Sequence, residues 1–170
     1  MKLLILTQYF PPEIGAPQNR LYELALRLQK KRVEVSVLTA MPNYPQMKIH
    51  QNYKGKCYCK ETLNELKIHR AWIYVSQSKS IISRLLNYFS FVISAFFIGA
   101  FKLKKQDVLM VESPPLFLGI TAYLLAKLKG AKLLFNVSDL WPESAEKLGI
   151  ISNKFLLSMA TKLEEFCYKK

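Results

Sequence analysis

The sequence has 170 residues, which is enough for one domain with a proper hydrophobic core but tight for two. Its 51% hydrophobic and 22% charged residues are typical of a globular protein and exclude a low-complexity chain. The balance of charge is unusual, because 25 Lys plus Arg residues stand against 12 Asp plus Glu residues and give a formal net charge of +13. This excess predicts a polyanionic partner, either nucleic acid or an anionic membrane surface.

The amino-terminal segment predicts a buried strand, a sharply turned loop and a helix. Residues 3–6 form a continuous apolar run that suits a parallel sheet covered on both faces. Residues 20–30 then place their apolar side chains at helical spacing. In the loop between them, Gly15 and Ala16 allow close backbone approach, and the helix amino terminus that follows offers free N–H groups to a phosphate. A tight strand-to-helix turn without a ligand is the alternative.

The same loop argues against two common classes of nucleotide-binding protein. It contains neither the G-x-G-x-x-G fingerprint of dinucleotide-binding folds nor the P-loop of nucleoside triphosphatases. A nicotinamide-dependent enzyme and a nucleoside triphosphatase are therefore both disfavoured.

The middle of the sequence predicts a second strand, a long polar loop and a hairpin. Apolar and polar side chains alternate over residues 33–37, and a polar loop follows from Thr39. Residues 56–62 and 66–75 flank a short turn and are expected to pair as an extended hairpin. His69 falls in this hairpin among basic neighbours, so we expect a surface histidine there rather than a catalytic one.

The cysteines and the amino terminus predict a cytosolic protein. Cys57, Cys59 and Cys167 form an odd set without a zinc-ligand pattern, and we expect three reduced thiols. The chain also lacks a D-x-D pair, so a divalent metal site has no support. Residues 3–6 are too short an apolar run for a secretion signal.

A long apolar helix is predicted over residues 81–101, followed by Lys102, Lys104 and Lys105. Its length nearly spans a bilayer, which takes about 20 apolar residues, but Arg84 and several other polar residues weaken that interpretation. We expect a helix that packs on the sheet with one face left for the membrane interface. A purely internal helix and a true membrane span are the alternatives. The flanking lysines suit anionic lipid.

The carboxyl-terminal part continues the alternation of strands and helices. Strands are predicted at 108–111 and 132–137, with a helix over 116–129 between them and Gly130 as its C-cap. Residues 153–170 form a further amphipathic segment. Strands that alternate with helices predict an α/β, Rossmann-like fold with a mostly parallel sheet and helices on both faces.

Polar residues at the predicted strand ends are the candidates for chemistry, because ligands of open parallel sheets bind beyond the carboxyl ends of the strands. Glu112 ends one strand, and the run SDLWPES over 138–144 follows another. Asp139 stands out because the chain contains only one other aspartate, Asp107. A cap for the next turn is the alternative role of Asp139.

Four segments stand out, in chain order: LTQYFPPEIGAPQNRLYELA, TAMPNYP, IHRAWIYVS and NVSDLWPES. Together they resemble the amino-terminal half of retaining glycosyltransferases of the sucrose-synthase-like, two-domain GT-B family (glycosyltransferase family 4). Within that family they resemble the bacterial surface-polysaccharide branch that contains fucosamine transferases. The similarity spans nearly the whole chain, and PPEIGAP and DLWPES are its most specific parts.

The resemblance implies a phosphate site and a sugar acceptor site. In the family the first strand-to-helix loop approaches the diphosphate of the sugar nucleotide, which assigns this role here to Gly15, Ala16 and Arg20. Many relatives place a histidine at or beside the positions of Glu112 or Ser138, and this chain has none at either.

The catalytic residues that the resemblance then favours are Asp139, nearest the acceptor hydroxyl, and Glu112. A strong general base is not required, because the departing phosphate can receive the acceptor proton in this class. The residues implied for acceptor binding are Asn43, Tyr44, Ser138 and Glu143.

The resemblance also implies that residues 1–170 are the acceptor-side half, and that a carboxyl-terminal domain with an E-x₇-E glutamate pair binds the donor outside this chain. No two glutamates here have that spacing. The implied substrates are a nucleotide sugar, expected to be a UDP-sugar, and a lipid-diphosphate-linked saccharide, with no separate cofactor and no metal. We expect a peripheral protein on the inner face of the cytoplasmic membrane and no nucleic acid partner. A non-catalytic membrane-recruitment subunit and a basic nucleic-acid-binding module are the alternatives.

Overall fold

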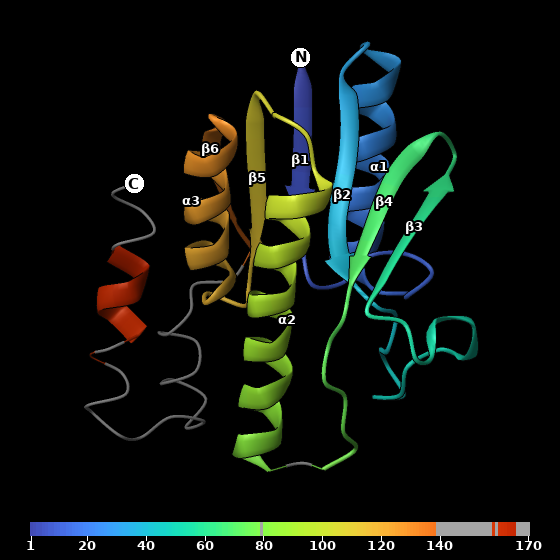
Figure 1. Cartoon of the computed structure of the whole chain (residues 1–170), viewed down its shortest axis with the longest axis vertical. Coiled ribbons are helices and arrows are strands. Elements are labelled where there is room, and N and C mark those ends of the chain that lie inside the picture. Colours follow the sequence, from blue (N-terminus) through green and yellow to red (C-terminus); the bar gives the residue numbers. More distant parts are fainter. Residues whose placement is uncertain (79, 139–157, 159, 166–170) are drawn as a thin grey trace.

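The computed structural model describes residues 1–78, 80–138, 158 and 160–165. Within them, parallel and antiparallel pairing forms one six-stranded sheet in the order β3-β4-β2-β1-β5-β6 (Figure 1). The strands are β1 (Lys2–Leu6), β2 (Glu34–Ala40), β3 (Tyr58–Leu63), β4 (Leu66–Ala71), β5 (Val108–Ser113) and β6 (Lys132–Val137). The helices are α1 (Ala16–Lys30), the short 3-10 turn η1 (Gln51–Tyr53), α2 (Ile81–Lys102) and α3 (Leu118–Lys129).

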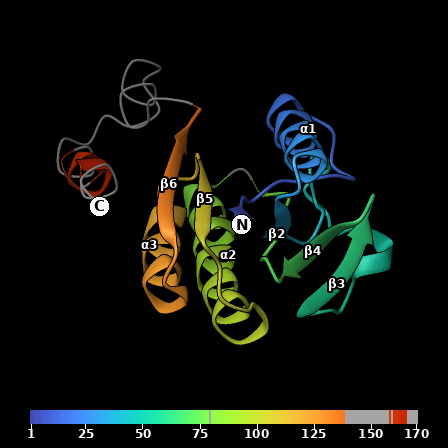
Figure 2. The same cartoon turned by 90° about the horizontal axis from the view of Figure 1, so that it is seen from above.

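The sheet is parallel except at one edge. β1 pairs in parallel with β2 and β5, β2 with β4, and β5 with β6, whereas β3 runs antiparallel to β4. Figure 2 shows α1 on one face of the sheet and α2 with α3 on the other. The predicted α/β, Rossmann-like class is confirmed.

The two faces bury alternate side chains of the same strands. In β1, Leu3 and Ile5 pack with the α1 residues Leu21 and Ala25. Leu4 and Leu6 pack instead in the cluster that α2 and α3 complete. Side chains of successive strand residues point to opposite faces, so a strand covered on both sides must be apolar throughout. The continuous run in β1 is explained in this way.

Helix α2 contacts the sheet along one narrow stripe. Its buried residues recur at every fourth position, which places them one above the other on the same side of the helix. Ser80 caps the helix, because its hydroxyl accepts from the backbone N–H of Ser83 at 3.2 Å. The buried stripe consists of Ser83, Asn87, Phe91, Ala95 and Gly99.

Helix α3 ends as its sequence predicts. Gly130 follows it in the left-handed conformation with φ 65°, and its backbone N–H lies 3.3 Å from the carbonyl oxygen of Lys127. The hairpin is also confirmed, since β3 and β4 pair from Tyr58 with Ala71 to Leu63 with Leu66.

Several element boundaries differ from the prediction. Thr39 lies inside β2 rather than in the loop, because the parallel pairing of β2 with β4 continues through it, and its buried hydroxyl donates to the carbonyl oxygen of Gln8 at 3.1 Å. Helix α1 begins at Ala16, four residues earlier than periodicity indicates. β5 extends through Glu112 and Ser113, since its parallel pairing with β6 continues to that point.

The expectation of a surface position for His69 is wrong. The residue is 6% exposed, and its Nδ1 lies 2.8 Å from the hydroxyl of Tyr58 on the neighbouring strand. Burial, with smaller effects of Lys60 and Lys67, lowers the pKa of His69 to about 4. The basic neighbours suggested an exposed position, and Lys60 and Lys67 are themselves exposed, but the His69 ring is buried.

Two of the three cysteines, Cys57 and Cys59, are free thiols in the structure. Cys167 lies outside the described residues, as does most of the predicted amphipathic segment 153–170, of which 158 and 160–165 are helical.

Candidate functional site

The candidate site lies at the carboxyl ends of the parallel strands. The loop after β1, the loop after β2 and the ends of β5 and β6 all meet at this edge of the sheet (Figure 1). The central strand β1 has β2 on one side and β5 on the other, so residues far apart in sequence become neighbours there.

Glu112 organises a polar cluster between β5, β6 and α1. Its side chain is almost fully buried, and its Oε1 accepts hydrogen bonds from the guanidinium of Arg20 and the hydroxyl of Ser138. Its Oε2 accepts from the side-chain amide of Asn136. The Arg20 guanidinium also donates to the Ser138 hydroxyl. Asn136 is placed here because it pairs with Glu112 in the β5–β6 register.

The cluster presents a positive charge to solvent. The side chain of Arg20 is 51% exposed, whereas that of Glu112 is 4% exposed. The buried Glu112 carboxylate accepts from a charged partner and from two further donors. Glu112 therefore holds Arg20 in place, and Arg20 is the member of the cluster that can reach an anionic ligand. These contacts suit a positioning role for Glu112, and its predicted catalytic role stays a prediction.

The first turn of α1 adds backbone donors beside Arg20. Gly15 occupies the N-cap position without a side-chain cap, and Pro17 follows at the start of the helix. The N–H groups of a first helical turn have no partner within the helix, so they favour an anion. Ala16 and Arg20 both belong to this amino-terminal part of α1.

The glycine at position 15 has a packing reason as well. Its φ is 176°, which any residue can adopt, but an added Cβ would lie 2.4 Å from Oε1 of Gln18. Gln18 is 4% exposed, and this oxygen has no hydrogen-bond partner among the described residues. The missing Cβ at Gly15 thus leaves room for the buried amide of Gln18, and the predicted phosphate contact at Gly15 stays a prediction.

Glu13 joins the loop after β1 to the loop after β2. One oxygen of its buried carboxylate accepts from the backbone N–H groups of Asn43 and Tyr44, each at 2.8 Å, and the other accepts from Phe10 at 3.3 Å. Burial raises the pKa of Glu13, and the three N–H groups oppose that rise. Asn43 and Tyr44, predicted to bind the acceptor, are held beside the first loop by this residue.

Arg70 also joins the loop after β1 to the end of β2 through hydrogen bonds. It is fully buried in β4, and its Nε donates to Oε1 of Glu61 at 2.6 Å. Its remaining nitrogens donate to the backbone carbonyl oxygens of Ala40 and Pro11. The guanidinium also lies 5.2 Å from the ring centre of Tyr53. One buried cation thereby ties the ends of β2 and β4 to the first loop.

Sequence reasoning missed both Glu13 and Arg70. Glu13 had one signal, an acid in the midst of the PPEIGAP loop. Arg70 had no such signal, because an arginine in the strand segment IHRAW looks like the many arginines that strands carry on an exposed face.

The predicted site residues fall into three groups. In the first group, Arg20, Glu112 and Ser138 are hydrogen-bonded to one another, and Gly15 and Ala16 begin the helix that carries Arg20. A second group lies on the loop after β2. There the side-chain amide of Asn43 is buried and donates to Met41, whereas Tyr44 is 42% exposed. Asp139 and Glu143, with the rest of DLWPES, lie outside the described residues.

No cluster of three or more His, Cys, Asp or Glu side chains that could hold a metal occurs in the described part of the chain.

The fold has a counterpart among solved structures. No protein-family model matches the sequence. The chain is similar in structure to the catalytic domain of Starch Synthase IV from Arabidopsis thaliana, bound there to ADP and acarbose, with a TM-score of 0.55 and 14% identity. The match covers 79% of this chain and 33% of that chain. It shows the fold, a Rossmann-like half of the GT-B type.

A sequence comparison leads to the same class of protein. The chain is 32% identical over 151 residues to "Putative colanic acid biosynthesis glycosyl transferase WcaI" of Escherichia coli (strain K12). The match covers 88% of this chain and 37% of that protein, so the chain spans little more than a third of the length of the relative. The sequence similarity supports a glycosyltransferase, and the structural similarity shows the fold alone.

Proposed function

We propose that this chain is the acceptor-side, Rossmann-like half of a retaining glycosyltransferase that acts in surface-polysaccharide biosynthesis. The observation that carries the proposal is the 32% identity to a glycosyl transferase over 88% of the chain. The cluster of Arg20, Glu112 and Ser138 at the strand ends supports it, because sugar transfer from a nucleotide needs a positive group where the diphosphate departs.

The proposed reaction uses the charge of this edge. A nucleotide sugar, for which we propose a UDP-sugar, would place its diphosphate against Arg20 and the first turn of α1. The bond between the sugar C1 and the diphosphate oxygen breaks, a bond from C1 to an acceptor oxygen forms, and the acceptor proton passes to the departing diphosphate. Arg20 would stabilise the negative charge that grows on the leaving group. Asp139 is proposed beside the acceptor hydroxyl, with Glu143 and the loop at Asn43 and Tyr44 lining the acceptor.

The test is a transfer assay with protein expressed from its complete natural gene. Labelled UDP-sugars are incubated with polyprenyl-diphosphate-linked sugars, and label in the lipid fraction is measured. We expect Arg20→Gln to lower kcat by roughly 10²- to 10³-fold, the cost of removing one positioned donor to a developing charge. Arg27→Gln, one exposed arginine further along α1, is the matched control. Wild-type turnover in Arg20→Gln would overturn the assignment of Arg20, and absence of transfer from every nucleotide sugar would overturn the activity.

The outer face of α2 supports a membrane location. Among the described residues, α2 is the one helix long and apolar enough to cross a membrane by length and composition. In its apolar stretch 22% of the residues are buried within the protein. Its inner stripe packs on the sheet, so the helix would lie on a membrane rather than cross it. Its exposed apolar residues are Ile81, Ile82, Leu85, Leu86, Phe89, Ile93, Phe97 and Phe101.

We propose that this face rests on the inner surface of the cytoplasmic membrane, where the lipid-diphosphate-linked acceptor would lie. Lys102, Lys104 and Lys105 at the end of α2 match the negative charge of anionic lipid. Vesicle sedimentation should show binding to anionic vesicles that weakens as salt rises. Phe101→Ser should reduce binding roughly tenfold, whereas Ile14→Ser, equally exposed on another surface, should not. Equal recovery in the supernatant with neutral and anionic vesicles would contradict the proposal. Vesicle binding without any transfer would favour a recruitment subunit.

A further inference from the structure

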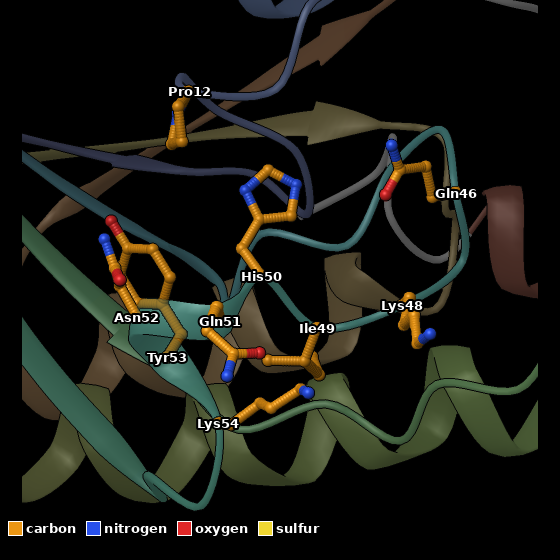
Figure 3. Close-up of a pocket in the computed structure, with 9 residues that line it drawn as sticks. All are labelled: Pro12, Gln46, Lys48, Ile49, His50, Gln51, Asn52, Tyr53 and Lys54. Atoms are coloured by element: carbon orange, nitrogen blue, oxygen red, sulfur yellow. The ribbon is translucent and has the colours of Figure 1, made fainter.

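A second feature of the strand-end edge is an open pocket of about 530 Å³ beside the first loop. Pro12 of the first loop lines one side, and Gln46 and residues 48–54 of the loop after β2 line the rest. Figure 3 shows the ring of His50 between Pro12 and the side chains of Lys48 and Lys54. None of the predicted site residues that the structure describes lines this pocket, and neither does any member of the Arg20 cluster.

The loop that forms the pocket is held in a defined conformation. The backbone N–H of Lys48 donates to Asn43 at 3.1 Å, and that of His50 donates to Pro42 at 3.0 Å. Tyr53 and Ile49 pack against the core on the α2 side of the sheet. The floor is therefore already built without a ligand.

The polar groups at the base of the pocket bond to one another, and they supply no carboxylate to the two lysines. The hydroxyl of Tyr53 donates to Glu61 at 2.9 Å, and Glu61 also pairs with the buried Arg70. No acid is found among the described residues that line the pocket. Among the described residues, neither Lys48 nor Lys54 forms an ion pair. Two exposed ammonium groups at one pocket favour an anionic group there.

The remaining lining favours a sugar over a bare anion. Gln46, Gln51 and Asn52 supply side-chain amides that can both donate to and accept from hydroxyl groups. Tyr53 and Pro12 add apolar surface at the same pocket. A concave site with a few polar groups, some apolar surface and two cations suits a saccharide that carries a negative charge.

We propose that this pocket binds the anionic group of an acidic saccharide, with Lys48 and Lys54 on the charge and the loop amides on the sugar hydroxyls. This proposal rests on the proposed function, because the saccharide would be part of the acceptor of that glycosyltransferase. The charge could be the carboxylate of a uronic acid or the phosphate of a sugar phosphate. Both present a compact anion beside a hydroxyl-bearing ring.

The test is an NMR titration of the 170-residue chain with four probes: glucuronate, glucose 1-phosphate, glucose and inorganic phosphate. We expect amide shifts over residues 46–54, and a Kd for glucuronate or glucose 1-phosphate at least tenfold lower than that for glucose. The stronger of these two probes identifies the source of the charge. Inorganic phosphate should bind more weakly than the charged sugars, and equal binding would overturn the saccharide part of the inference.

Charge-matched variants separate the pocket from the overall charge of the protein. Lys48→Gln with Lys54→Gln should raise the Kd about tenfold, which corresponds to about 1.4 kcal/mol. Lys30→Gln with Lys31→Gln, at the far end of α1, removes the same charge and should change it less than twofold. Equal effects of both pairs, or shifts outside 46–54, would overturn the inference. Transfer activity without pocket binding would overturn the pocket inference and leave the proposed function intact. Pocket binding without transfer would support the saccharide site and overturn the proposed function.

Discussion

The two faces of the sheet are covered by helices of opposite character. Helix α1 buries Leu21 and Ala25 and turns the charged residues Glu23 and Arg27 outward, where they pair at 3.4 Å. Helix α2 buries its own stripe in the same way, yet its outer side is apolar. The need to cover a parallel sheet determines only the inner side of each helix. The outer side chains of each helix suit its surroundings, which are water for α1 and, as we propose, lipid for α2.

The contrast within α2 should give the largest effect. Phe91 is fully buried and Phe101 is 79% exposed, although both are phenylalanines of one helix. Phe91→Ala should lower the free energy of unfolding by about 3–5 kcal/mol, because it removes buried surface and leaves a cavity. Phe101→Ala should change it by less than about 0.5 kcal/mol. Urea denaturation of both variants measures the difference. Similar losses would mean that the outer face of α2 is also part of the folded core.

The face covered by α2 also contains a buried titratable ring. Alternation along β4 places His69 on the same side as Ala71, which belongs to the α2-side core. Its pKa of about 4 in the folded protein lies below the ordinary value of 6.5, so the unfolded chain binds more protons between these values. This contribution to stability is present above about pH 6.5 and is lost as the pH falls toward 4.

The measurement is the free energy of unfolding of the wild type and of His69→Gln at pH 7 and pH 4.5. Glutamine can keep a hydrogen bond to Tyr58 without titrating. The wild type should lose more stability than the variant, by no more than about 3 kcal/mol. Parallel losses in both proteins would show that His69 titrates as in the unfolded chain.

Close packing of α2 on α3 should give a smaller effect. A Cβ at Gly99 would lie 2.5 Å from Cδ1 of Leu125, which is fully buried. Gly99→Ala should cost about 1–3 kcal/mol from overpacking, offset by about 1 kcal/mol of better helix propensity. A double-mutant cycle with Leu125→Ala should reveal favourable coupling, since the smaller side chain removes the clash. Strict additivity would show that the two helices are not in the contact described.

The equivalent test on the α1 face should give the smallest effect. A Cβ at Gly15 would meet the flexible end of Gln18 rather than a branched buried side chain. Gly15→Ala should therefore cost less than Gly99→Ala, below about 1 kcal/mol, because the amide can rotate away. Thermal denaturation of the two variants side by side gives the order. A larger loss at Gly15 would mean that the first loop is as tightly packed as the α2–α3 contact.

Much of the architecture could be predicted because it depends on local patterns. Three elements could be identified from residues close together in sequence. They are β1 from its continuous apolar run, α1 from its helical spacing, and the end of α3 from Gly130. The boundaries that failed, at Thr39 and Glu112, are positions where a polar residue stays in a strand because its partner is elsewhere in the chain.

The sequence by itself determined the strands, the helices and the class of fold, since a side chain's apolar character and spacing are local properties. The tertiary structure decided which polar residues meet. Arg20 and Glu112 are 92 positions apart and become partners only because β1 lies between β2 and β5. Glu13 reaches Asn43 and Arg70 reaches Pro11 for the same reason. Buried polar groups must find partners wherever the strand order places them, and one sequence contains many pairings that only the folded sheet can choose among.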